Sequence, residues 1–284
     1  MSVDYAALAN TIKIGDITSD EVNQSILHKL KNNDESLDSL HIVSVAGKND
    51  DDKYVPIDGE DDMGWLGYFI GQNTKLQVLQ VFETIDNEFY KGMSCNTSIR
   101  VLVFCSIGVL NVEVFNMLNP FFKINISLTG IEVSACNLGA DSIRQLSLAI
   151  GGCSKSMKQI TMARNVVGEG GSAVDIITAL SMHPQLEKLR LSTMNIGRNE
   201  CTALSTLLRC TITQLQSLEL YGNNIDDEAI GLLVPALCGH TLRDMKLGSN
   251  RSITINGWKA VSTLLEAPDS KLKTLHIHGN NALR

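Results

Sequence analysis

The chain has 284 residues, of which 44% are hydrophobic and 5% aromatic, and its formal net charge is −7. Residues 48–62 contain seven acidic residues and two lysines, a net charge of −5, which leaves only −2 for the rest of the chain. A nucleic-acid-binding surface needs a basic face, so the charge argues against a nucleic-acid partner. No apolar run approaches the ~20 residues of a membrane-spanning helix, and no membrane association is predicted.

The cysteines are odd in number and show no CxxC pairs. The N-terminus lacks the basic start and apolar run of a signal peptide. Both features indicate a reducing compartment, so we expect a cytoplasmic protein whose cysteines are core residues that behave as small hydrophobic side chains. The cysteines are Cys95, Cys105, Cys136, Cys153, Cys201, Cys210 and Cys238.

Residues 1–34 begin the chain with a predicted helix over Asp20–Lys31. The sequence Thr18-Ser19-Asp20-Glu21 is typical of a capping box, with a Ser or Thr three residues before a Glu. Apolar residues then follow at helical spacing. These are Val22, Ile26, Leu27 and Leu30. We interpret residues 1–34 as a helical cap that covers the open end of a repeat array.

From residue 37 onward the pattern LxxLxLxxN recurs nine times, with other apolar residues accepted for leucine. The matches start at residues 37, 76, 99, 128, 157, 186, 215, 242 and 272, and four consecutive spacings are 29 residues. Alternation within each match predicts a strand, so nine parallel strands are expected. Their centres lie near residues 40–42, 79–81, 102–104, 131–133, 160–162, 189–191, 218–220, 245–247 and 275–277.

The ninth template position is asparagine only in the later repeats, at Asn165, Asn223, Asn250 and Asn280. An asparagine amide can bond backbone groups left open where the chain turns out of the strand. The early repeats lack it, and we expect their turns to be less regular.

The first repeat is 39 residues long because it contains an acidic insertion, residues 48–64. Low hydrophobicity and dense like charge predict a solvated, mobile loop. The carboxylates between Asp58 and Asp62 are hard oxygen ligands, but the EF-hand spacing with its distal Glu is absent, so no calcium site is predicted.

The second repeat has 23 residues, enough for little more than a turn after its strand. The other repeats carry helices that bury apolar pairs such as Ile143 with Leu146 and Val261 with Leu265. These helices are predicted over residues 65–70, 111–119 (ended by Pro120), 141–150, 171–181, 200–209, 227–237 and 257–266.

The repeats resemble those of leucine-rich-repeat proteins. Lengths of 27–30 residues with a full helix, and the turns Asn195-Ile196-Gly197 and Asn223–Ala229, resemble the ribonuclease-inhibitor-like subtype. The resemblance covers roughly residues 35–284. It implies an α/β solenoid, a horseshoe with an inner parallel sheet and outer helices, which binds other proteins on its concave inner face. It names no partner and no reaction.

Residues between the template leucines point to the predicted concave face, where the first three repeats place an apolar group. A contiguous exposed apolar patch usually marks an interaction site. The alternative is that the N-terminal part covers it. The group consists of Val43, Val78, Phe82, Val101, Val103 and Cys105.

A second candidate zone alternates charge along one column, with Arg190, Glu219 and Lys246 on neighbouring strands. Tyr221 lies beside them, and Tyr and Arg are favoured at interface hot spots. We therefore propose Arg190, Tyr221 and Lys246 as partner-binding residues. The alternative is a solvated ladder without a partner, because exposed opposite charges largely satisfy each other.

No catalytic motif of the GxxxxGK, GxSxG or HExxH type occurs, and Gly168–Gly171 fits a strand-to-helix turn. His276 and His278 share a face near Asp244 but lack a fourth ligand, so no metal is predicted. We predict no enzyme activity and no cofactor. The expected function is a non-catalytic scaffold that binds a protein partner of unknown identity; the alternative is a regulator of an enzyme, of the inhibitor or GTPase-activating type.

The last predicted strand, Thr274–His278, is followed by only six residues. An unpaired strand edge invites another chain. The sequence leaves three alternatives: a fragment of a longer array, self-association through this C-terminal edge, or a monomer whose edge is protected by Lys271 and Lys273.

Overall fold

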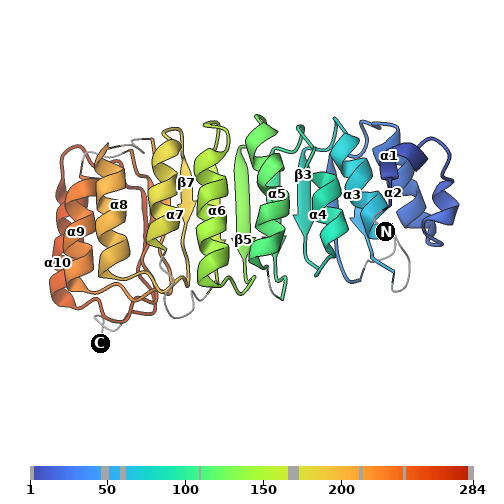
Figure 1. The fold of residues 1–284 in the computed structure, drawn as a ribbon. Coiled ribbons are helices and arrows are strands. Elements are labelled where there is room, and N and C mark those ends of the chain that lie inside the picture. Colours follow the sequence, from blue (N-terminus) through green and yellow to red (C-terminus); the bar gives the residue numbers. More distant parts are fainter. Residues whose placement is uncertain are drawn as a thin grey trace.

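The computed structural model describes residues 3–280 apart from residues 46–50, 58–61, 109, 166–172, 211–213 and 239–240. Ten parallel strands form one sheet in the order β10-β9-β8-β7-β6-β5-β4-β3-β1-β2 (Figure 1). They are β1 Ser39–Ile42, β2 Lys53–Tyr54, β3 Val78–Val81, β4 Val101–Cys105, β5 Gly130–Ser134, β6 Gln159–Ala163, β7 Lys188–Arg190, β8 Ser217–Glu219, β9 Asp244–Lys246 and β10 Thr274–His276. All nine predicted strands are present and parallel, which confirms the α/β solenoid.

The template leucines stack in layers because neighbouring repeats pair in the predicted register. Leu218 lies opposite Leu189 on one side and Met245 on the other. Leu218 and Leu220 are fully buried, as are their counterparts in most repeats. Each fully buried aliphatic side chain contributes roughly 1.5–3 kcal/mol, so these layers dominate the stability of the array.

The helices lie together on one side of the sheet (Figure 1). They are α1 Tyr5–Leu8, α2 Glu21–Lys31, α3 Asp62–Gln72, α4 Asn87–Met93, α5 Val112–Ile124, α6 Ala140–Gly152, α7 Val174–Ala179, α8 Arg198–Cys210, α9 Asp227–Leu237 and α10 Ile255–Glu266, with 3-10 turns at Ile14–Asp16 and Leu180–Met182. We call the opposite side of the sheet the open face. Its side chains alternate with buried ones: in β7, Lys188 and Arg190 are exposed while Leu189 is buried. Within the described ranges, no helix has the length and apolarity needed to cross a bilayer.

Two helices differ from the sequence prediction. Helix α5 does not end at Asn119 but continues through Pro120 to Ile124. Proline leaves the carbonyl four residues earlier, that of Asn116, without a helical partner. Both Pro120 and Asn116 are exposed, so water can satisfy that carbonyl. In α10, Val261 and Leu264 are buried, whereas Leu265, predicted to be buried, is 53% exposed.

The short second repeat holds a full helix, α4, where only a turn was predicted. It fits because glycines let α3 and α4 approach backbone to backbone. A Cβ on Gly67 would lie 2.3 Å from the Phe89 carbonyl oxygen, and one on Gly92 would lie 2.6 Å from the Gly67 carbonyl carbon. No larger residue fits either position without moving a helix.

The acidic insertion is partly structured, which corrects the prediction of a solvated loop over residues 48–64. Lys53 and Tyr54 form β2, which pairs with β1, and Tyr54 is fully buried. The Tyr54 hydroxyl donates a hydrogen bond to Asp62 Oδ2 at 3.0 Å, and Asp62, 1% exposed, already belongs to α3. Most of the calcium alternative, Asp58–Asp61, lies outside the described residues.

The N-terminal helix α2 forms nearly as predicted, but its cap differs. Asp20, not Thr18, caps the helix, because Asp20 Oδ1 accepts a hydrogen bond from the Asn23 amide at 2.8 Å. Val22 is 41% exposed, whereas Ile26, Leu27 and Leu30 are buried as expected.

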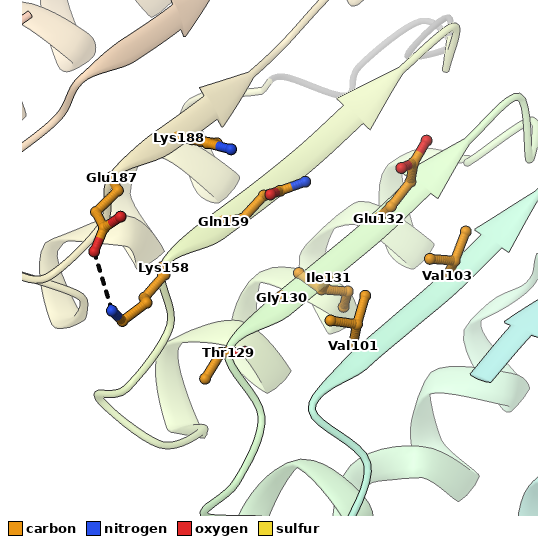
Figure 2. Close-up of a pocket in the computed structure, with 10 residues that line it drawn as sticks. All are labelled: Val101, Val103, Thr129, Gly130, Ile131, Glu132, Lys158, Gln159, Glu187 and Lys188. Atoms are coloured by element: carbon orange, nitrogen blue, oxygen red, sulfur yellow. Dashed lines mark ion pairs between the residues drawn. The ribbon is translucent and has the colours of Figure 1, made fainter. Parts of the chain in front are cut away.

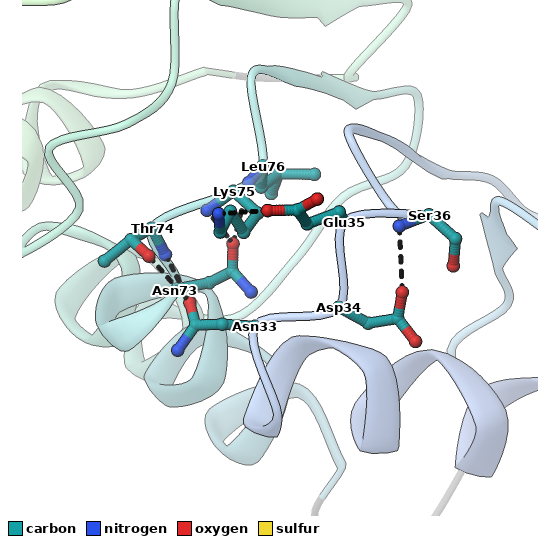
Figure 3. A network of polar contacts seen from close by, with 8 residues as sticks. All are labelled: Asn33, Asp34, Glu35, Ser36, Asn73, Thr74, Lys75 and Leu76. Atoms are coloured by element: carbon teal, nitrogen blue, oxygen red, sulfur yellow. Dashed lines mark hydrogen bonds and ion pairs between the residues drawn. The ribbon is translucent and has the colours of Figure 1, made fainter.

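Asparagines support the turns at both ends of the strands. Asn223 Nδ2 donates to the Leu191 carbonyl at 2.7 Å, and its Oδ1 accepts from the Met194 amide at 2.9 Å. The early repeats carry the same device at the opposite, helix-to-strand turn. There Asn73 Nδ2 donates to the Leu30 carbonyl, and its Oδ1 accepts from the Lys75 and Leu76 amides (Figure 3). Asn96 Nδ2 likewise donates to the Ile70 carbonyl of α3, and Asn125 Nδ2 donates to the Ile99 carbonyl, just before β4. In the early repeats, asparagine thus supports the helix-to-strand turn, whereas in the later repeats it supports the strand-to-helix turn.

The six cysteines whose side chains are described are all free thiols. Cys136, Cys153 and Cys201 are buried, as predicted. Cys95 and Cys238 are exposed and Cys105 is half-buried, so the core prediction is wrong for these three.

Candidate protein-binding surface

The open face carries all of the predicted partner-binding residues, and each of them is accessible to some degree. Arg190 is exposed, and the others are half-buried. The apolar cluster, as we call the first group, comprises Val43, Val78, Phe82, Val101, Val103 and Cys105. The charged ladder consists of Arg190, Glu219 and Lys246.

The apolar cluster lies on β3 and β4 and includes Val43 and Phe82, the residues that directly follow β1 and β3. Val78 lies directly opposite Val101, and the Phe82 ring meets His41 edge to face at 6.4 Å between ring centres. The described N-terminal elements pack elsewhere: Tyr5 of α1 contacts Trp65 of α3, with ring centres 5.0 Å apart, on the helix side. The described part of the N-terminus thus leaves the cluster accessible.

In the charged ladder, one carboxylate forms ion pairs with both cations. Glu219 accepts from Arg190 Nε at 2.9 Å and from Lys246 Nζ at 2.8 Å. Its side chain is 14% exposed, against 45% for Arg190 and 43% for Lys246. Burial alone would raise the pKa of Glu219, but hydrogen bonds from Lys246 and Ser192 and the two neighbouring cations outweigh it, and the pKa lies below its ordinary value. Glu219 therefore holds the two cations in fixed positions on the open face.

The Tyr221 ring lies over Gly248 of the next repeat and does not project straight out into solvent. A Cβ on Gly248 would come within 3.0 Å of the Tyr221 ring, so the glycine leaves the space in which the ring rests. From there Tyr221 reaches His278, with ring centres 5.5 Å apart. His276 and His278 are 6.5 Å apart between ring centres. Among the described residues no three metal-ligating groups converge.

Between the apolar cluster and the charged ladder lies a depression that the sequence analysis missed. One hollow, of about 270 Å³, has Val101, Val103 and Gly130 on one side and Gln159 and Lys188 on the other (Figure 2). A second, of about 190 Å³, adjoins it and shares Glu132, Gln159 and Lys188. We call the two together the central trough.

The central trough contains two small open-face residues of the middle strands. Gly130 lies between Val101 and Gln159 on the neighbouring strands, and Thr161 lies between Glu132 and Arg190. The signal was present in the sequence, where Gly130 and Thr161 hold smaller side chains than their neighbours Val101, Gln159, Glu132 and Arg190.

Most charges lining the central trough have partners. Lys158 pairs with Glu187 at 3.1 Å, and Glu132 Oε1 accepts from the Ser134 hydroxyl at 2.8 Å. Lys188 makes no ion pair within the described part of the chain, and Figure 2 shows its side chain extending beside that of Gln159. The trough therefore offers one apolar end and one unpaired cation.

One cysteine–histidine pair lies outside the open face, at the turn before β7. Cys153 Sγ is 3.9 Å from His183 Nε2, and both residues are buried. Burial raises the pKa of Cys153 to about 12 and lowers that of His183. A nucleophilic pair needs a thiolate beside an imidazolium, the opposite of these shifts, so we interpret this pair as structural.

Comparison with known proteins agrees with the repeat architecture. No family model matches the sequence. The ribonuclease inhibitor of Sus scrofa is 27% identical over 154 residues, which cover 54% of this chain and 33% of the relative. The matched part thus spans about a third of that protein's length. This similarity agrees with the single parallel sheet and its repeated strand–helix units, which have a leucine-rich-repeat architecture similar to that of the ribonuclease inhibitor.

Proposed function

We propose that the chain is a non-catalytic scaffold that binds a protein partner on its open face. The observation that carries the proposal is an accessible apolar cluster next to a trough and a fixed pair of cations on one continuous sheet surface. A contiguous exposed apolar patch on a protein surface usually marks an interaction site. The free thiols support a reducing compartment as the place of action.

The energetics favour the apolar cluster as the anchor. Burying one large apolar side chain contributes roughly 1.5–3 kcal/mol. The exposed ion pairs of the charged ladder contribute at most about 1 kcal/mol each, because water and salt screen them. The ladder and Tyr221 then define orientation and selectivity more than affinity.

Replacing Phe82 and Val103 together by Asp tests the proposal. We expect partner capture to fall by at least about tenfold, because two anchors are lost and two charges enter the contact. Thermal stability should change little, since both side chains are half-buried on the open face and their removal leaves no enclosed cavity. Capture from cell extract, quantified by mass spectrometry, measures the first effect, and circular dichroism the second.

The matched control is the pair Leu148→Asp and Ile255→Asp, which places the same charges on exposed apolar positions of α6 and α10. Capture should be unaffected there. Full capture by the Phe82→Asp, Val103→Asp variant would rule out the apolar cluster, and equal loss in the control would mean that added charge, not the site, is responsible.

Inhibition of an enzyme is the second candidate function, favoured by the similarity to a protein named ribonuclease inhibitor. Titrating the chain into a ribonuclease assay tests it. Inhibition that saturates at one chain per enzyme and is lost in the Phe82→Asp, Val103→Asp variant would support it. Unchanged hydrolysis at a large excess of the chain would contradict it for ribonucleases.

A further inference from the structure

We infer that the central trough binds an extended partner segment that presents an apolar side chain and, three residues later, a carboxylate. The inference rests on the proposed function and specifies its partner. It follows from four properties of the trough: its volume, its apolar end, its unpaired cation and the distance between the two ends.

The apolar end of the trough fits an aromatic side chain. Gly130 contributes no side chain, and a Cβ built there would lie 3.5 Å from Val101 Cγ2, at ordinary contact distance. Val103 forms the same wall. The whole hollow, about 270 Å³, is open to solvent and leaves room for a ring beside the two valines. A phenylalanine ring inserted over Gly130 would therefore contact the two valines without displacing them.

The opposite end of the trough selects a negative charge. Lys188 has no ion pair among the described residues, and beyond it Arg190 and Lys246 share the single carboxylate of Glu219. This end therefore carries more cations than anions. Glu187 does not compensate Lys188, because Lys158 binds it at 3.1 Å.

Glu132 gives the occupant a direction. Its carboxylate lines both hollows and accepts only a neutral donor in the described contacts, the Ser134 hydroxyl. An acidic group placed next to Glu132 would be repelled, so the occupant's carboxylate must lie toward Lys188. A segment bound in the reverse direction would put its carboxylate beside Glu132.

The spacing of the strands sets the spacing of the motif. Gly130 in β5 and Lys188 in β7 are two strands apart. Parallel strands lie ~4.8 Å apart, which gives ~10 Å between the two positions. A segment in the polyproline II conformation rises ~3.1 Å per residue with three residues per turn, so the side chains of residues i and i+3 point to the same side and lie ~9 Å apart. The motif is therefore Phe-x-x-Glu, running across the strands.

Short synthetic peptides test the inference on the full chain. The probes are an acetylated peptide containing Phe-Ser-Ser-Glu and its counterpart Phe-Ser-Ser-Lys, titrated into isotope-labelled protein and followed by amide chemical shifts. We expect the Glu peptide to bind in roughly the millimolar range, as one anchor and one ion pair allow. The amides of Gly130, Gln159 and Lys188 should shift, and the Lys peptide should bind about five- to tenfold more weakly.

Two variants of the trough sharpen the test. Gly130→Val puts a side chain into the hollow, where a Cβ would lie 3.5 Å from Val101 Cγ2, and should abolish peptide binding. Urea unfolding of the variant checks that it stays folded. Lys188→Glu should reverse the preference in favour of the Lys peptide. The control is Gly231→Ala, an exposed glycine of α9 whose Cβ would meet nothing within 4 Å.

Three results would overturn the inference: equal affinity for the two peptides, unchanged binding by Gly130→Val, or shifts confined to residues away from the trough. Its failure is distinguishable from failure of the proposed function. If Gly130→Val captures the cellular partner normally while the Phe82→Asp, Val103→Asp variant does not, the scaffold function stands and the trough is not its anchor.

Discussion

His183 stands at the helix-to-strand turn in the place that asparagine holds in three early repeats, and it makes only part of the asparagine's hydrogen bonds. Its Nε2 donates to the Ile150 carbonyl at 2.8 Å, as Asn96 Nδ2 does to the Ile70 carbonyl at 2.7 Å. The asparagine also uses its oxygen, which accepts from the Ser98 amide. His183 Nδ1 is buried without a partner. The histidine thus keeps one of the two bonds and adds a titratable group to the core.

Acid should destabilise the fold through His183. Burial lowers its pKa in the folded chain, with the Ile150 hydrogen bond acting weakly the other way. In the unfolded chain its pKa is about 6.5, so below that pH the unfolded state binds a proton that the folded state does not. The contribution to the free energy of unfolding is complete above pH ~6.5 and is lost as pH falls through the lowered pKa.

His183→Asn should reduce this acid sensitivity, because asparagine can make both turn bonds and carries no charge. Urea unfolding at neutral and mildly acidic pH, compared between the natural chain and the variant, measures the effect. The other five histidines are present in both chains and cancel in the comparison. The same loss of stability on acidification in both proteins would show that His183 is not the group responsible.

Thiol reactivity should divide the cysteines by burial. Burial raises the pKa of Cys136 to about 11 and that of Cys153 and Cys201 to about 12, so almost no thiolate is present at neutral pH. Cys95 and Cys238 are exposed. We expect alkylation of the native chain to modify Cys95 and Cys238 within minutes and to leave the three buried thiols intact until urea is added. Peptide mapping by mass spectrometry identifies the sites, and early modification of Cys153 would contradict the buried turn.

At the scale of secondary-structure elements, the pair α3–α4 is sensitive to side-chain size. Gly92 faces the backbone of Gly67 and Tyr68, at 2.6 Å from a built Cβ. Backbone atoms cannot rotate away as a side chain can, so Gly92→Ala must separate the helices. Overpacking of this kind costs about 1–3 kcal/mol, which outweighs the gain of up to about 1 kcal/mol from alanine in a helix. Urea unfolding followed by circular dichroism measures the loss.

The exposed glycine of α9, Gly231, provides the matched control. Its Cβ would meet nothing within 4 Å, so Gly231→Ala changes helix propensity alone and should stabilise the chain slightly. If Gly92→Ala were as stable as Gly231→Ala, the close approach of α3 and α4 would not be required for the fold.

The sequence predicted elements whose cause is local and missed those whose cause is not. The strands follow from alternation, and Leu218 and Leu220 are buried as the template requires. β2 depends instead on a bond between Tyr54 and Asp62 across residues that look like a loop. Helix α4 depends on glycines that match across two helices, and α5 continues because Pro120 happens to face water. None of these three features produces a repeating pattern in the sequence.

The candidate site shows the same division. Alternation along the strands was enough to put Phe82, Val103 and Arg190 on the open face. The central trough could not be predicted by listing prominent residues, since it depends on the absence of side chains at positions such as Gly130. Whether the open face binds a partner stays a prediction.

The whole molecule is a row of repeats in which each outer helix packs against the helices of the neighbouring repeats. The stability of such an array is approximately a sum of repeat and nearest-neighbour terms, so a local defect should be felt locally. The chain carries a reporter near each end, because its two tryptophans are Trp65 in α3 and Trp258 in α10. Each end can therefore be followed by fluorescence in a variant that keeps one tryptophan and has phenylalanine at the other.

We predict that Gly92→Ala will lower the urea midpoint reported by Trp65 more than that reported by Trp258. Leu264→Ala should do the reverse, because Leu264 is a buried residue of α10 and its truncation costs about 2–5 kcal/mol at that end. Each variant is compared with its own single-tryptophan background, so the tryptophan replacement cancels. Equal shifts of both reporters in both variants would show that the array unfolds as one cooperative unit. Shifts of opposite asymmetry in the two variants would show that the two ends of the array have separate stabilities. A partner that contacts the open face from β3 to β9 would then couple the two ends and raise both urea midpoints together.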